Sequence, residues 1–112
     1  MKRVLPTLVF AMLSTACSAK SDYERLVEAA DSGNAGAMYA LFVTIEQRGN
    51  PEHPITDEEQ KIATHWLIRA GEGNDSRAAK VLALCYEKGC FGVPKDHEKA
   101  LHYERLAGSP AP

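Results

Sequence analysis

The chain has 112 residues, of which 45% are apolar and 25% are charged, close to the values of an ordinary globular protein. This length allows one domain and excludes large enzyme folds such as a complete (α/β)₈ barrel. The net charge of −2 argues against nucleic acid as a partner, because phosphate binding requires a basic surface.

The first 16 residues have the composition of an export signal. Lys2 and Arg3 supply positive charge at the start, and the apolar run 4–13 follows them. A helix of this run is too short to span a bilayer, which needs about 20 residues. Without the two basic residues, the rest of the chain carries 11 bases and 15 acids, a net charge of −4.

Residues 13–17, Leu-Ser-Thr-Ala-Cys, resemble the lipobox of bacterial lipoproteins. The resemblance implies a lipid on Cys17, which becomes the first mature residue, and residues 17–21 as a short tether. Because Ser18 is not Asp, it also implies the periplasmic face of the outer membrane. Small side chains at 17–19 also allow ordinary cleavage after Ala19, which would give a soluble periplasmic protein. The sequence leaves both alternatives open.

From residue 22 onward, apolar residues recur at helical spacing in five segments. After the signal, Ala is also more frequent than Val, Ile and Thr together, which favours helix over strand. We therefore predict an all-α fold whose helices span 22–31, 35–48, 57–70, 76–88 and 96–107.

Capping residues delimit these helices. Ser21 with Glu24, and Thr56 with Glu59, have the spacing of a capping box at a helix N-terminus. The expected N-caps of the other helices are Asn34, Asp75 and Asp96. Glycines stand where the helices are predicted to end, at positions 33, 49, 73, 89 and 108.

The helices repeat after 37–40 residues. Residues 30–34, with the pattern A-x-x-G-N, return as 70–74, and residues 63–66, Ala-x-x-aromatic, return as 100–103. This period is typical of stacked helix pairs, in which each pair buries its apolar face against the next. Trp66 is therefore expected to be buried between adjacent pairs.

The second unit, residues 78–108, reads AxxxLAxxYEKGxxGVPKDxEKAxxYxxxAG and resembles a Sel-1-like repeat, a variant of the tetratricopeptide repeat. Its loop 89–92 has one residue more than the commonest form. In the first unit Ile45 replaces the usual Tyr, and residues 50–55 replace the Gly-Val-Pro loop. The resemblance covers a domain at 22–109 and implies a short right-handed α-solenoid of antiparallel helix pairs.

Cys85 and Cys90 flank the predicted helix end at Gly89. If Gly89 is the C′ residue of a Schellman motif, the Cys90 N–H bonds to the Cys85 carbonyl and the two side chains meet. A disulfide would then persist in the oxidising compartment that an export signal implies. The alternative is one core cysteine and one exposed thiol.

No residue pattern predicts a metal site, a cofactor or a catalytic centre. His97 and His102 are about 140° apart around a helix, whereas helical zinc ligands share one face. The chain also lacks a Gly-x-Ser-x-Gly turn and a phosphate-binding glycine loop. We expect no enzyme. The contrasting hypothesis is a hydrolase, because some cysteine-rich relatives of these repeats are linked to β-lactam hydrolysis.

The resemblance also predicts a binding surface, because the first helix of each pair lines the concave face of tetratricopeptide-like solenoids. This candidate surface consists of Tyr39, Val43, Glu46, Gln47, Arg77, Lys80, Leu84, Glu87 and Lys88. Its apolar members favour a protein partner over simple solvation.

Repeat framework residues serve packing and do not identify the partner. The resemblance implies an exported, non-enzymatic module that binds another protein. One role is an immunity protein that neutralises a secreted antibacterial toxin, such as a phospholipase effector. The other is an envelope assembly or regulatory scaffold. The lipid on Cys17 would supply the membrane contact.

Overall fold

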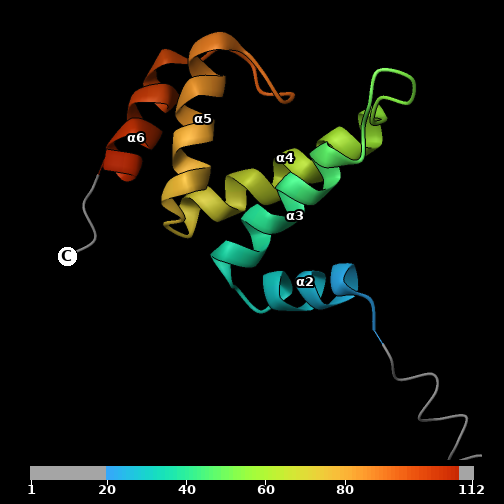
Figure 1. The fold of residues 1–112 in the computed structure, drawn as a ribbon. Coiled ribbons are helices and arrows are strands. Elements are labelled where there is room, and N and C mark those ends of the chain that lie inside the picture. Colours follow the sequence, from blue (N-terminus) through green and yellow to red (C-terminus); the bar gives the residue numbers. More distant parts are fainter. Residues whose placement is uncertain (1–19, 109–112) are drawn as a thin grey trace, which may run out of the picture.

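The computed structural model describes residues 20–108, and this part of the chain contains five helices and no strand. They are α2 (Asp22–Asp31), α3 (Ala35–Gln47), α4 (Asp57–Glu72), α5 (Ser76–Lys88) and α6 (His97–Gly108) (Figure 1). The all-α class is therefore confirmed, with each helix end within two residues of its predicted position. The predicted signal 1–16, the predicted lipidation site Cys17 and residue 109 lie outside the described residues.

Consecutive helices lie against each other. α3 packs beside α4 and α5 beside α6, and Figure 1 shows the second pair set at a steep angle to the first. α2 packs against α3, and contacts between α4 and α5 join the two pairs. None of the helices between residues 20 and 108 is long and apolar enough to cross a membrane.

Local capping starts each helix where the sequence predicts it. The Ser21 hydroxyl accepts from the Glu24 N–H while the Ser21 N–H donates to the Glu24 carboxylate, and Thr56 and Glu59 form the same reciprocal pair. In α3, α5 and α6 a side-chain oxygen of the N-cap residue accepts a hydrogen bond from the backbone N–H three residues further along the chain. The residues that do so are Asn34, Asp75 and Asp96.

The end of α4 differs from the prediction. The helix continues to Glu72, two residues further than expected, and Asn74 rather than Gly73 has a positive φ, of 71°. The Asp75 N–H bonds to the Ala70 carbonyl at 3.0 Å, which completes a Schellman motif one residue later than the glycine pattern indicated.

The longer helix places Gly71 where three helices meet. A Cβ at this position would lie 2.6 Å from Leu82 Cδ1 of α5 and 3.2 Å from Tyr103 Cε1 of α6. Gly71 itself is buried, and Leu82 has no exposed surface. α4 can approach the second helix pair this closely only because residue 71 lacks a side chain.

One apolar core contains residues of all five helices. Its largest fully buried side chains are Leu41, Leu67, Leu82 and Cys85. The burial predicted for Trp66 is confirmed, since this residue is 9% exposed. Tyr103 is 5% exposed, and its ring stacks on that of Tyr86 with the centroids 5.7 Å apart. This aromatic stack packs α5 against α6.

Candidate protein-binding surface

Within the candidate surface, the start of α5 contacts α3 through Tyr39 and Arg77. The Arg77 guanidinium carbon lies 4.7 Å from the centroid of the Tyr39 ring. This cation–π contact joins a residue of the first helix pair to a residue of the second.

Asp75 holds Arg77 in this position. Its Oδ2 lies 2.8 Å from Arg77 Nη2, while its Oδ1 accepts from the Ala78 N–H as the N-cap of α5. Burial alone would raise the pKa of this carboxyl, but hydrogen bonds from Arg77 and Ala78 outweigh it and hold the pKa below its ordinary value of 3.8. One carboxylate, 7% exposed, therefore both starts α5 and orients the arginine.

Asp75→Ala is expected to lower the free energy of unfolding by about 0.5–2 kcal/mol, because α5 loses its N-cap. Asp75→Asn keeps a capping oxygen and should cost less. Since the folded-state pKa is lowered, the advantage of wild type over Asp75→Asn should be present above about pH 4 and disappear as the pH falls through that pKa. Urea unfolding across this pH range measures the difference; an advantage that persists in strong acid would contradict the assignment.

An aromatic row continues from Tyr39 across α3 to the loop that follows α5. The Tyr39 and Phe42 ring centroids are 5.9 Å apart, and Phe91 meets Phe42 edge to face at 5.1 Å. Phe42, in the middle of the row, is buried, while Tyr39 is half-buried and Phe91 is 37% exposed. Both ends of the row therefore reach the surface, and aromatic surface of this kind is enriched at protein interfaces.

Phe91 is the partly exposed member of this row that the sequence analysis did not place on the candidate surface. Its φ is +48°, in the left-handed region that bulky residues avoid, and the φ of Gly92 is +79°. The Val93 N–H bonds to the Cys90 carbonyl at 3.0 Å and closes a tight turn with both central residues left-handed. The one sequence signal for this feature is the extra residue in the 89–92 loop. A phenylalanine held in so unfavourable a conformation points to a role for its side chain.

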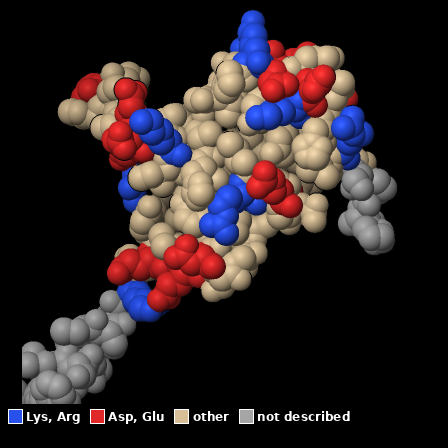
Figure 2. All heavy atoms as spheres, turned by 180° about the vertical axis from the view of Figure 1, so that it is seen from behind, with Lys and Arg blue, Asp and Glu red and all other residues tan. Residues whose placement is uncertain are grey.

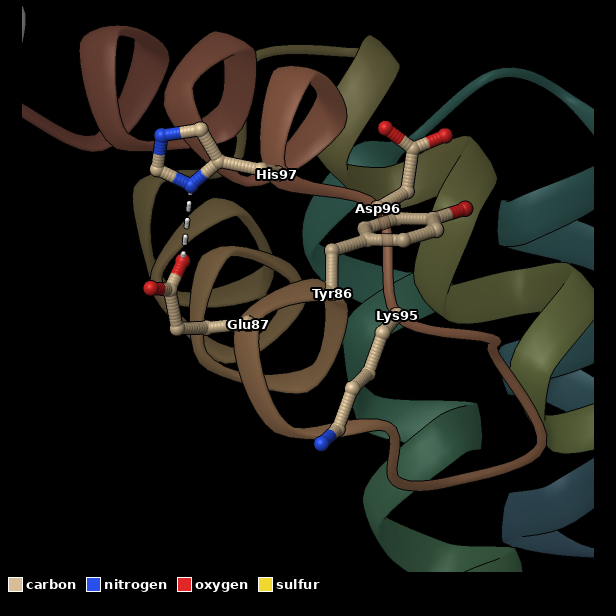
Figure 3. A pocket seen from close by; sticks show the side chains of 5 residues that line it. All are labelled: Tyr86, Glu87, Lys95, Asp96 and His97. Carbon is tan, nitrogen blue, oxygen red and sulfur yellow. Dashed lines mark ion pairs between the residues drawn. The ribbon is translucent and has the colours of Figure 1, made fainter.

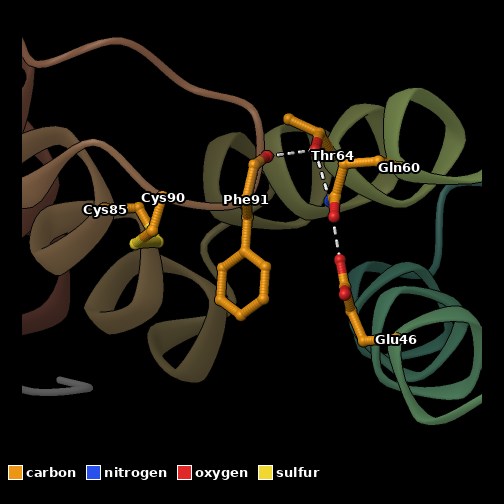
Figure 4. The surroundings of a disulfide bond; sticks show 6 residues. All are labelled: Glu46, Gln60, Thr64, Cys85, Cys90 and Phe91. Carbon is orange, nitrogen blue, oxygen red and sulfur yellow. Dashed lines mark hydrogen bonds between the residues drawn. A yellow bond between two sulfur atoms is a disulfide. The ribbon is translucent and has the colours of Figure 1, made fainter. Parts of the chain in front are cut away.

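Two attachments fix Phe91 (Figure 4). On one side a disulfide joins Cys85 to Cys90, whose Cα atoms are 4.7 Å apart. On the other side the Phe91 carbonyl accepts a hydrogen bond from the Thr64 hydroxyl of α4. The loop of the second helix pair is thereby tied to a helix of the first.

Further hydrogen bonds connect Thr64 to α3 (Figure 4). The Gln60 amide donates to Thr64 Oγ1 at 3.1 Å and to Glu46 Oε2 at 2.6 Å. Glu46, a member of the candidate surface, thus helps to fix α3 relative to α4 and the Phe91 loop.

The cap of α5 differs from the expected Schellman motif. Gly89 is left-handed, with φ +77°, but its own N–H bonds to the Cys85 carbonyl at 2.6 Å, which is the simpler αL motif. The chain reversal at Gly89 nevertheless brings Cys90 back to Cys85, within the Cα separation that a disulfide requires.

The remaining members of the candidate surface differ in exposure. Val43 is half-buried against the core. The exposed members are Gln47, Lys80, Leu84, Glu87 and Lys88. Leu84, at 59% exposed, is the most open of the large apolar side chains in the part of the chain that the structure describes.

Glu87 faces α6 (Figure 3). Its Oε2 lies 3.6 Å from His97 Nδ1, and the two side chains line a shallow hollow together with Tyr86, Lys95 and Asp96. In Figure 3 the Lys95 side chain extends away from this pair. Glu87 is therefore engaged with α6 rather than with the Tyr39–Arg77 contact.

The histidines show no metal-binding arrangement. His102 lies edge-on to Tyr103, with 4.9 Å between the ring centroids. Over residues 20–108, no three His, Cys, Asp or Glu side chains are grouped so that they could hold a metal ion.

Comparison of the chain with models of protein families finds no match, and comparisons with curated proteins and with solved structures find none either.

Proposed function

We propose that this chain is a non-enzymatic protein-binding module, a short right-handed α-solenoid of Sel-1-like repeats, which binds through the candidate surface extended by Phe91. The observation that supports this most is the left-handed Phe91, partly exposed at the end of the row Tyr39–Phe42–Phe91. A disulfide and a hydrogen bond hold this aromatic side chain at the surface. Rigidly held aromatic side chains are typical anchors of protein interfaces.

Equivalent positions in the two helix pairs support the repeat architecture. Leu41 of α3 and Leu82 of α5 are both fully buried, and each lies seven residues after its N-cap. Trp66 of α4 and Tyr103 of α6 are both buried aromatic residues. Two helix pairs that bury matching positions are what a stacked repeat requires.

We further propose that the module works in the bacterial cell envelope. This part rests on the signal 1–16 and the lipobox cysteine Cys17. The Cys85–Cys90 disulfide is compatible with an oxidising compartment such as the periplasm. The proposed roles are immunity against a secreted toxin, such as a phospholipase effector, and, as the alternative, an assembly or regulatory scaffold.

The direct test is a photo-crosslinking amino acid in place of Leu84, whose exposed side chain can be replaced with little loss of packing. It is expected to give an adduct with one specific protein in envelope preparations. The matched control is the same amino acid in place of Leu101, which is 40% exposed on α6 and should not give that adduct. An adduct formed from Leu101 and not from Leu84 would contradict the proposed surface.

With the crosslinked partner purified, Tyr39→Ala combined with Leu84→Ala is expected to weaken binding by about 1–3 kcal/mol, about 5- to 150-fold. Tyr39 is half-buried and contacts Phe42, so the double variant will also lose some stability. Leu84→Ala alone is therefore measured beside it, because this change leaves the core intact. Isothermal calorimetry gives the affinities.

His97→Ala combined with His102→Ala is the matched control for this binding measurement and should bind the partner as the wild type does. If the histidine variant loses binding while the Tyr39–Leu84 variant keeps it, the proposed function is wrong. If both variants bind normally, the interface lies elsewhere, and the loop 50–55 becomes the next surface to test.

A further inference from the structure

α5 differs from the other helices in its charge. It carries Arg77, Lys80 and Lys88 against one acid, Glu87, and is the only helix between residues 20 and 108 with a net positive charge. By contrast, Figure 2 shows acidic side chains gathered where α2 begins, beside the grey N-terminal residues. α5 is thus a local basic surface on a chain that is acidic as a whole.

Lys80, Leu84 and Lys88 form a row along α5. Neighbours in the row are four residues apart, about 6 Å along the helix axis, and all three lie within about 80° of arc. All three side chains are exposed. Within residues 20–108, neither lysine forms an ion pair.

The acidic groups of the candidate surface and its cap already have other partners. Asp75 pairs with Arg77, Glu87 faces His97 across the hollow of Figure 3, and Glu46 accepts from Gln60. None of these carboxylates forms an ion pair with either of the two lysines that flank Leu84.

We propose that the Lys80–Leu84–Lys88 row binds an acidic amphipathic helix of the partner protein. In that helix one apolar residue has a carboxylate four residues before it and another four residues after it. Residues four apart in the partner helix are separated by about 6 Å along its axis, as neighbours in the α5 row are. Both carboxylates therefore meet ammonium groups of the lysines while the apolar residue covers Leu84. In an extended strand the same residues would stand about 13 Å apart and miss the lysines.

This inference rests on the proposed function and adds the chemistry of the partner. The probe is a synthetic alanine-based helical peptide with one Leu flanked by Glu at four residues on either side. Titrated into the ¹⁵N-labelled protein, it is expected to shift the amide resonances of α5 and to bind at least about tenfold more weakly in high salt than in low salt. No shift in α5 at millimolar peptide would overturn the inference.

Reversing the charges of the two lysines gives a stricter test. Lys80→Glu combined with Lys88→Glu is expected to reduce binding of the Glu peptide at least about tenfold and to create binding of a matched peptide with Lys in place of Glu. Lys61→Glu combined with Arg105→Glu, exposed bases on α4 and α6, is the control of equal charge change and should keep the preference for the Glu peptide.

The outcomes separate this inference from the proposed function. If wild type binds the Lys and Glu peptides equally at α5, acidic specificity is wrong while a protein-binding surface remains. If vesicles of phosphatidylglycerol shift the α5 resonances and the Glu peptide does not, the row is a membrane contact and the inference fails. The proposed function itself is decided by the Leu84 crosslink, which needs no assumption about partner charge.

Discussion

Trp66→Ala is expected to lower the free energy of unfolding by about 3–5 kcal/mol, the cost of truncating a large aromatic residue in a packed core. Trp66 is 9% exposed, belongs to the apolar core and has the Arg69 guanidinium carbon 5.2 Å from its ring centroid. Small domains have about 5–15 kcal/mol of stability in total. The variant should therefore be largely unfolded at temperatures where the wild type is folded.

Urea unfolding followed by circular dichroism measures this loss. The control is Ile62→Ala on the same helix, because Ile62 is 48% exposed and its truncation should cost less than about 1 kcal/mol. In the wild type, the emission of the chain's single tryptophan should shift to the red on unfolding. Equal costs for the two variants, or tryptophan emission already typical of exposed indole in the native protein, would contradict the packing described for Trp66.

The positions of the helices could be predicted from the sequence because their causes are local. The two capping boxes need only a hydroxyl and a glutamate three residues apart, and the apolar spacing of each helix is read within a few turns. Ser21 with Glu24 and Thr56 with Glu59 accordingly form the expected hydrogen bonds. The structure therefore departs from the predicted ends by at most two residues.

The extension of α4 could not be predicted, because it depends on residues far away in the sequence. Gly73 and Asn74 are both acceptable where a helix ends, and the adjacent pair Gly-Asn alone does not show which of the two takes the left-handed conformation. The choice follows from Gly71, which lies against Leu82 and Tyr103 of the second helix pair. Only the packed structure shows that contact.

In the candidate surface too, some features have local causes and others depend on residues far apart in the sequence. Tyr39 and Arg77 were placed on one surface through the repeat resemblance, and the structure brings them into contact at 4.7 Å. Phe91 was missed because its left-handed conformation depends on the Cys85–Cys90 disulfide and on Thr64 of another helix. The extra residue in the 89–92 loop is the one local sign of these constraints, and it does not show which side chain the loop holds at the surface.

Gly71→Ala is expected to destabilise the protein by about 1–3 kcal/mol, although alanine normally favours a helix over glycine by about 0.5–1 kcal/mol. The new methyl group would stand 2.6 Å from Leu82 Cδ1 and 3.2 Å from the Tyr103 ring. Neither neighbour can withdraw easily, because Leu82 has no exposed surface and Tyr103 is stacked on Tyr86. α4 must therefore move away from the second helix pair.

The control for this change is Gly108→Ala at the end of α6, where a Cβ would have no heavy atom within 4 Å and the effect should stay within about 0.5 kcal/mol. A double-mutant cycle then locates the clash. Leu82→Ala alone should cost about 2–5 kcal/mol, but less in the Gly71→Ala background, because the shortened side chain makes room for the methyl group. If Gly71→Ala stabilises the protein, or if the two costs simply add, α4 does not pack on α5 through Gly71. The junction between the two helix pairs would then have to lie elsewhere along α4.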